Sequence, residues 1–245
     1  MQTFYMTDAG KVRTHNEDNV IILNNNNEFI LAVADGMGGH KAGEVASNIA
    51  IEYVKESFES LETLGKKEDA IDYLRKIVKE INDKIFDYTK SHPESKGMGT
   101  TLVIAIKTED YVLYGNIGDS SGYVIKNGTL HKITKDHTLV NLLVSTGELT
   151  PEQAKFHPRK NLLTRALGAN DPIEIDIFDV DTAVSGLFLC SDGLTNMVAD
   201  DQIEKVLNNK SSIEEQVEKL IKKSNMRGGT DNISIAYLKK ESGDL

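Results

Sequence analysis

Two short apolar runs in the sequence each end near an aspartate followed by a glycine. Residues 29–34 are followed by Asp35-Gly36, and residues 186–190 by Ser191 and then Asp192-Gly193. Each run predicts a buried strand, because it is short, apolar and bounded by turn residues. An Asp-Gly hairpin turn would lead into a second strand, but a glycine-rich loop or a helical pattern follows instead. Carboxylates placed in this way are oxygen ligands suited to a hard divalent cation.

Four more acidic residues stand beside predicted strands. Glu17 and Asp18 come directly before one strand, Asp119 follows another, and Asp231 precedes the last one. Each of these residues alone is an ordinary turn or surface residue. If the strand ends meet at one edge, the carboxylates would repel one another strongly unless a cation neutralised them. A metal site therefore depends on a convergence that sequence spacing supports only weakly.

The elements that would position these acids are hairpins and paired helices. Strand-like segments are expected at 2–6, 20–24, 28–34, 100–107, 110–117, 121–126, 129–133, 173–180, 185–190 and 232–238. Asn127-Gly128 is a strong two-residue hairpin signal. Apolar stripes at helical spacing run from 45 to 61 and from 71 to 88, and again at 203–207 and 213–221. Hairpins with separate amphipathic helix pairs indicate a layered α+β fold.

Composition describes an ordinary globular chain of 245 residues with a net charge of −10, which argues against nucleic acid or an anionic membrane as main partner. With one cysteine, Cys190, an internal disulfide is impossible, and its apolar surroundings predict a buried structural thiol. The N-terminal segment lacks a signal-peptide pattern, and no apolar run approaches the ~20 residues of a membrane span. We therefore expect a cytoplasmic protein.

Eight motifs, taken together and in order, resemble the metal-dependent serine/threonine protein phosphatases, the PPM or type 2C family, in their compact bacterial form. They are TDxGxxRxxNED, VADGMGGHxAGE, MGTTL, GDS, DHTLV, NLLTRALG, CSDGL and GGTDNIS, between Thr7 and Tyr237. The resemblance implies a four-layer α-β-β-α sandwich of two antiparallel sheets flanked by helix pairs. It also implies one catalytic domain over 1–240 with a small flap at about 138–160, and a tail at 241–245.

The same resemblance implies two divalent cations, Mn²⁺ or Mg²⁺, per subunit. Asp35 would bridge the two ions, and the carbonyl of Gly36 would bind one of them, which would explain the need for a residue without a side chain. Asp192 and Asp231 would complete the site of the other ion. Asp119 matches the position that, with Asp192, holds a third and weaker ion in bacterial members.

Other matched residues would act around the ions. Glu17 and Asp18 would accept hydrogen bonds from metal-bound water molecules. Arg13 would hold the phosphate, for which a guanidinium is well shaped. His40 is a candidate general acid for the leaving group, with substrate positioning as the alternative. One departure from the family pattern is Ser121, because the family usually has arginine after GDS. Activity should survive this change, which bears on the local charge balance or the hinge packing near Asp119.

The implied activity is hydrolysis of phosphoserine and phosphothreonine on cytoplasmic proteins by a metal-bridging hydroxide, opposing a serine/threonine kinase. The implied protein is a monomer that binds phosphorylated proteins, and neither nucleic acid nor membrane. One alternative is a serine hydrolase, because residues 118–122 read G-x-S-x-G; this motif needs a strand–turn–helix context, whereas a strand and hairpin follow here. The other alternative is a phosphoprotein-binding module without activity, although Asp35, Asp192 and Asp231 are all present.

Overall fold

The computed structural model of the chain describes residues 1–39 and 42–241, which form two antiparallel sheets. The first sheet contains, in spatial order, β1 (Gln2–Asp8), β11 (Ile233–Lys239), β10 (Gly186–Cys190), β7 (Ser121–Lys126) and β8 (Thr129–Lys132). The second contains β2 (Asp18–Asn25), β3 (Glu28–Met37), β5 (Leu102–Lys107), β6 (Val112–Ile117) and β9 (Asp176–Val180), and the short β4 (Gly99–Thr100) pairs with β3.

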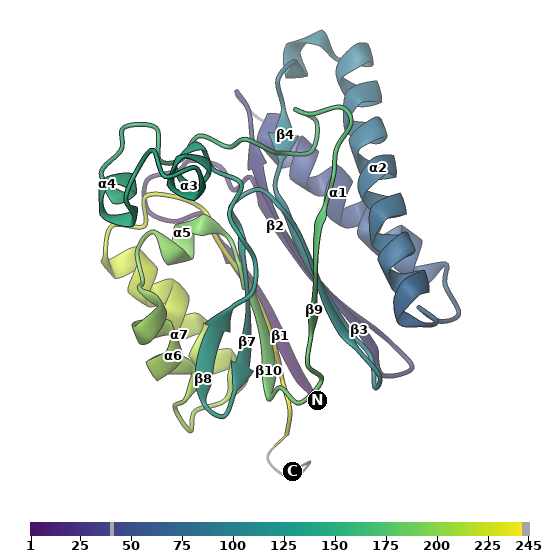
Figure 1. Cartoon of the computed structure of the whole chain (residues 1–245), viewed down its shortest axis with the longest axis vertical. Coiled ribbons are helices and arrows are strands. Elements are labelled where there is room, and N and C mark those ends of the chain that lie inside the picture. Colours follow the sequence, from purple (N-terminus) through teal and green to yellow (C-terminus); the bar gives the residue numbers. More distant parts are fainter. Residues whose placement is uncertain (40–41, 242–245) are drawn as a thin grey trace.

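Helices cover the outer face of each sheet (Figure 1). The second sheet is covered by α1 (Ala42–Glu59) and α2 (Lys67–Ser91), and the first by α6 (Asp200–Leu207) and α7 (Ile213–Met226). The expected four-layer α-β-β-α sandwich is therefore confirmed. The remaining helical segments are η1 (Pro93–Ser95), α3 (Leu139–Ser145), α4 (Pro151–Lys155) and α5 (Asp192–Thr195). Of these, α3 and α4 lie in the segment expected to be a flap.

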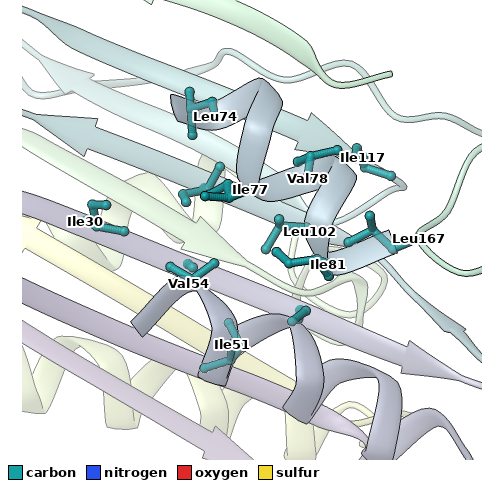
Figure 2. Close-up of a cluster of buried hydrophobic side chains, with 14 of the residues drawn as sticks. Ile30, Ile51, Val54, Leu74, Ile77, Val78, Ile81, Leu102, Ile117 and Leu167 are labelled. Atoms are coloured by element: carbon teal, nitrogen blue, oxygen red, sulfur yellow. The ribbon is translucent and has the colours of Figure 1, made fainter. Parts of the chain in front are cut away.

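Separate hydrophobic clusters hold the layers together. One lies between the second sheet and its helices, where Ile51 and Val54 of α1 and Leu74 and Ile77 of α2 approach the sheet around Ile30 (Figure 2). Another lies between the first sheet and α5 to α7, and a third lies between the two sheets. Burial of this apolar surface is the main stabilising contribution to such a fold.

The alternation of side chains in β3 explains why its sequence is continuously apolar. Ile30, Ala32 and Ala34 belong to the cluster under α1 and α2, whereas Leu31 and Val33 belong to the cluster between the sheets. Successive side chains of a strand point to opposite faces, and here both faces are covered. The strand has no solvent face, so no polar residue interrupts the run.

The strand expected at 20–24 spans Asp18–Asn25, so Asp18 lies inside it and not before it, and the strand expected at 173–180 begins at Asp176. Two further boundaries were wrong for a common reason. The strand expected at 28–34 continues to Met37, so Asp35 lies inside the strand and not beyond its end. The segment expected at 100–107 is divided at Thr101 into β4 and β5. Gly36 pairs with Thr100 and Met37 with Gly99, and this long-range pairing extends β3 past the turn-like Asp-Gly sequence.

The first helix ends at Glu59, so Leu61, the last residue of the predicted stripe, packs against the core from the segment after the helix.

Other local predictions were confirmed. The hairpin between β7 and β8 turns at Asn127 and Gly128, both with positive φ. Cys190 is fully buried, and burial raises the pKa of its thiol, so it is a structural residue. In the described part of the chain, every helix is too short or too polar to span a bilayer.

Candidate active site

The acidic residues that the sequence singled out converge at one end of the sandwich. Most of them line one cavity of about 600 Å³. The expected site residues among its lining are Arg13, Glu17, Asp35, Gly36, Asp119, Asp192 and Asp231. They come from both sheets, so the site lies where the two sheets meet, beside the end that carries α3 and α5 (Figure 1). His40 lies outside the described residues.

Asp18 lies behind the cavity wall. It faces Asp35 across the β2–β3 ladder and is buried, with one carboxylate oxygen, Oδ2, accepting a hydrogen bond from Ser191 Oγ at 2.6 Å. Its other oxygen, Oδ1, has no hydrogen-bond partner among the described residues. Asp192 is similar: Oδ2 accepts from Asn196 Nδ2 at 3.0 Å, and the buried Oδ1 finds no partner in the described part of the chain. Buried carboxylate oxygens without partners are costly, and a cation beside them would offset that cost.

The electrostatics of the cluster agree with this interpretation. Burial, with repulsion from neighbouring carboxylates, raises the pKa of Asp18 and of Asp119 to about 7 and that of Asp192 to about 6. Burial, together with the charges of Asp18 and Asp192, also raises the pKa of Asp35 well above its usual value. A protein keeps such a like-charged buried group where a counter-ion binds or where a proton is needed.

Arg13 and Arg165 bring positive charge to the lining of the cavity. Arg13 Nη2 donates to Asp231 Oδ2 at 2.9 Å, and half of the Arg13 side chain is exposed. Among the described residues, no three acidic, histidine or cysteine side chains are close enough to enclose a metal ion as they stand. Asp231 accepts one hydrogen bond on each oxygen, from Arg13 on Oδ2 and from the amide of Asn232 on Oδ1, and each oxygen keeps a further lone pair for a metal ion. The donor set of carboxylates and a backbone carbonyl nevertheless fits Mg²⁺ or Mn²⁺.

Neutral side chains that sequence reasoning missed hold the acidic segments in place. Thr101 Oγ1 accepts from the amide of Asp35 at 3.0 Å and hydrogen-bonds Ser120 Oγ at 2.8 Å, which joins β3 to the loop of Asp119. Asn232 Oδ1 accepts from the amide of Glu17 at 2.8 Å. These residues stand in the motifs MGTTL, GDS and TDN, but the sequence alone did not indicate their partners.

Gly36 is required for packing as well as for any carbonyl contact. A Cβ at this position would collide with the carbonyl oxygen of Gly43 in α1 and would crowd that of Glu17. The amide of Gly36 donates to the latter oxygen at 3.1 Å. The backbone of β3 therefore packs directly against the first turn of α1. This helix follows the glycine-rich loop in the sequence.

We expect Gly36→Ala to lower the free energy of unfolding of the metal-free protein by about 2–3 kcal/mol, because the backbone must shift to admit the methyl group. Gly39→Ala is the matched control, since a Cβ there meets no atom of residues 1–39 or 42–241 within 4 Å. Urea denaturation in the presence of a chelator measures both. Equal stability of the two variants would contradict the packing argument.

The G-x-S-x-G segment does not form a nucleophile elbow. Gly118 to Ser120 connect β6 to β7, so the context is strand–loop–strand. Ser120 and Ser121 are buried, and the hydroxyl of Ser120 is hydrogen-bonded to the hydroxyl of Thr101. A nucleophilic serine needs an exposed hydroxyl beside a base, so this alternative is not supported.

Comparison with known proteins shows the family of the chain and agrees with its fold. The sequence model described as protein phosphatase 2C matches residues 9–229, and the chain belongs to this family. It is 43% identical over 242 residues to the serine/threonine phosphatase Stp of Listeria welshimeri, covering 98% of this chain and 96% of that protein. It is 34% identical to protein phosphatase PhpP of Streptococcus pneumoniae, over 100% and 99% of the two chains.

Solved structures of bacterial phosphatases share the architecture. The serine/threonine phosphatase Stp1 of Staphylococcus aureus superposes with a TM-score of 0.91 at 37% identity, over 98% of this chain and 95% of that one. The Mycobacterium tuberculosis phosphatase PstP superposes with a TM-score of 0.88 at 34% identity, over 98% of both chains.

Proposed function

We propose that the chain hydrolyses phosphoserine and phosphothreonine on cytoplasmic proteins with two divalent cations, Mn²⁺ or Mg²⁺, bound by its carboxylate cluster. The chain is a protein serine/threonine phosphatase, as its family and its full-length relatives show. Membership of this family implies divalent-metal dependence and phosphoprotein substrates. The observation that carries the proposed mechanism is the set of buried carboxylates with unpartnered oxygens beside one cavity.

Each cation would take its ligands from the end of the sandwich. Asp35 would bridge both ions, the carbonyl of Gly36 would bind one, and Asp192 and Asp231 would bind the other. Asp119 would hold a third, weaker ion together with Asp192. When bound, such ions supply a water nucleophile at neutral pH and neutralise the charge of the phosphoryl group. Glu17, which lines the cavity, and Asp18, which lies behind its wall, would act through water molecules.

The protein itself would position the substrate. Arg13 lines the cavity with half of its side chain exposed, and its guanidinium would exchange Asp231 for two oxygens of an incoming phosphate. His40 is proposed as the general acid, with substrate positioning as its alternative. We further propose that residues 1–240 form one catalytic domain with a flap at 138–160, and that the protein is a cytoplasmic monomer that opposes a serine/threonine kinase.

Arg13→Ala is expected to raise KM about tenfold with a smaller fall in kcat, because the phosphate contact is made alike in the ground and transition states. The affinity of the Arg13→Ala protein for Mn²⁺ should not fall, because Asp231 no longer pairs with Arg13 in this variant. Arg75→Ala is a control on the surface of α2, where the arginine pairs with an exposed Asp72. An unchanged KM would contradict the proposed contact.

Matched peptides test the substrate class. Three peptides of one sequence, carrying phosphothreonine, phosphoserine or phosphotyrosine at the same place, are incubated with the protein and Mn²⁺. We expect phosphate release from the first two and little from the third, with chelator abolishing all of it. Binding of the peptides without release of phosphate would instead support the binding-module alternative.

A further inference from the structure

A histidine outside the acidic cluster connects the loop of Asp119 to the base of the flap. His137 lies between β8 and α3 and is 9% exposed. Its Nδ1 lies 3.1 Å from the amide nitrogen of Gly118, and its Nε2 lies 3.1 Å from Asp176 Oδ2. Nothing in the proposed reaction uses this ring, although it lies in the DHTLV motif.

The partners of the ring define its protonation state. The amide of Gly118 can only donate, so Nδ1 must carry a lone pair and Nε2 must carry the proton that Asp176 accepts. Burial lowers the pKa of His137, which favours the same neutral ring. The histidine therefore acts as an acceptor on one side and as a donor on the other.

On the acceptor side, the ring holds the residue that precedes Asp119. Gly118 has φ +102°, and a Cβ there would collide with Thr101. The carbonyl of Gly118 accepts from the amide of His137 at 2.9 Å and from Asn116 Nδ2 at 3.1 Å. The amide of Gly118 is satisfied by the imidazole ring alone, so the ring completes the hydrogen bonding of this turn.

On the donor side, the ring bonds Asp176 at the base of the flap, where backbone hydrogen bonds also join the two chain segments. The amide of Thr164 donates to the carbonyl oxygen of His137 at 2.8 Å, and the amide of Leu139 donates to the carbonyl oxygen of Leu162 at 2.8 Å. Asp176, which accepts from the ring, also accepts from Arg165 Nη1 at 2.6 Å. One carboxylate thus joins the segment that enters the flap to the segment that leaves it.

We propose that His137 is a positioning residue: its neutral ring holds the turn before Asp119 through Nδ1 and holds Asp176, at the base of the flap, through Nε2. The consequence for an ion held by Asp119 rests on the proposed third cation. The part that concerns Gly118 and the flap base does not.

Two substitutions separate the two sides of the ring. His137→Asn places an amide group near the position of Nδ1 and can still accept from Gly118, but it cannot reach Asp176. His137→Gln places an amide group near Nε2 and can still donate to Asp176, but it leaves the amide of Gly118 without a partner. Each variant loses one of the two buried hydrogen bonds and keeps the other, so the two sides of the ring are tested separately. A role limited to stability would lower the stability of both variants without the selective loss of metal affinity tested below.

Amide hydrogen exchange measured by NMR on the metal-free protein is the primary test. We expect faster exchange of Gly118 in His137→Gln only, and faster exchange of Leu139 and Thr164 in His137→Asn only. Equal effects of both variants on both sites, or no effect of either, would overturn the proposal.

Calorimetric titration with Mn²⁺ tests the consequence for metal binding. We expect the affinity of the weakest site to fall by about 10–100-fold in His137→Gln, the range for residues that orient metal ligands, and to stay near the wild-type value in His137→Asn. Asp119→Asn should abolish this site altogether. If the wild type and Asp119→Asn bind the same number of ions, the third cation of the proposed function is wrong, and the exchange data alone decide the role of His137.

Discussion

Asp192→Asn is expected to lower kcat/KM for a phosphothreonine peptide by about 10³-fold at saturating Mn²⁺. Asp192 stands at the start of α5 with a buried oxygen that has no hydrogen-bond partner. It would contribute to the second ion and to the weaker third. Loss of a metal ligand removes several kcal/mol of transition-state stabilisation, and each 1.36 kcal/mol corresponds to a factor of ten in rate.

The substitution keeps the local structure, because an asparagine oxygen can still accept from Asn196. Asp201→Asn on α6 is the matched control, since Asp201 is exposed and paired only with Lys205. Initial rates and circular dichroism of both variants, measured side by side, distinguish loss of activity from loss of fold. A folded Asp192→Asn protein with the wild-type rate would contradict the metal assignment.

The metal-free protein is expected to lose stability as the pH rises from about 4 to about 7, by an amount on the order of several kcal/mol. The folded-state pKa values of Asp18 and Asp119 are raised to about 7 and that of Asp192 to about 6. In this interval the folded chain therefore binds more protons than the unfolded chain. Stability is complete below the unfolded pKa values and is lost as the pH passes through the folded ones.

Bound cations should reverse this trend. Mn²⁺ binds the ionised carboxylates, so its stabilising effect should increase between pH 5 and pH 7.5. Asp176, whose pKa is lowered even though burial opposes the shift, affects stability only at lower pH. Urea denaturation at several pH values, with chelator or with Mn²⁺, measures both effects. A shallower pH dependence is expected for Asp192→Asn, and metal-free stability that increases towards pH 7 would contradict the electrostatic account.

The sequence predicted the elements well because their signals are local. The hairpin at Asn127-Gly128 and the stripes of α2 and α7 depend on residues close together in the chain. The extension of β3 to Met37 could not be predicted in this way, since it depends on pairing with Gly99 and Thr100. An Asp-Gly sequence that reads locally as a turn is held in a strand by a distant segment.

The acidic residues of the site were predicted from the sequence, whereas the neutral residues that hold them in place were not. The carboxylates were recognised from their motifs and from their places beside strands, and the structure brings them together. Ser191, Thr101 and His137 are neutral residues whose importance depends on partners in other segments, namely Asp18, Asp35 and Gly118. Residue type alone gives no signal for such contacts. The reason for Gly36 was also incomplete, because its close approach to α1 is visible only in three dimensions.

The central claim is that the carboxylate cluster binds divalent cations that make the chain a phosphatase. Phosphate release from a phosphothreonine peptide by chelator-treated protein, titrated first with Mn²⁺ and then with Mg²⁺, tests it most directly. The account predicts no release without metal, restored release with either ion, and no restoration in Asp192→Asn at the same concentrations. Full release by the metal-stripped wild-type protein would contradict it.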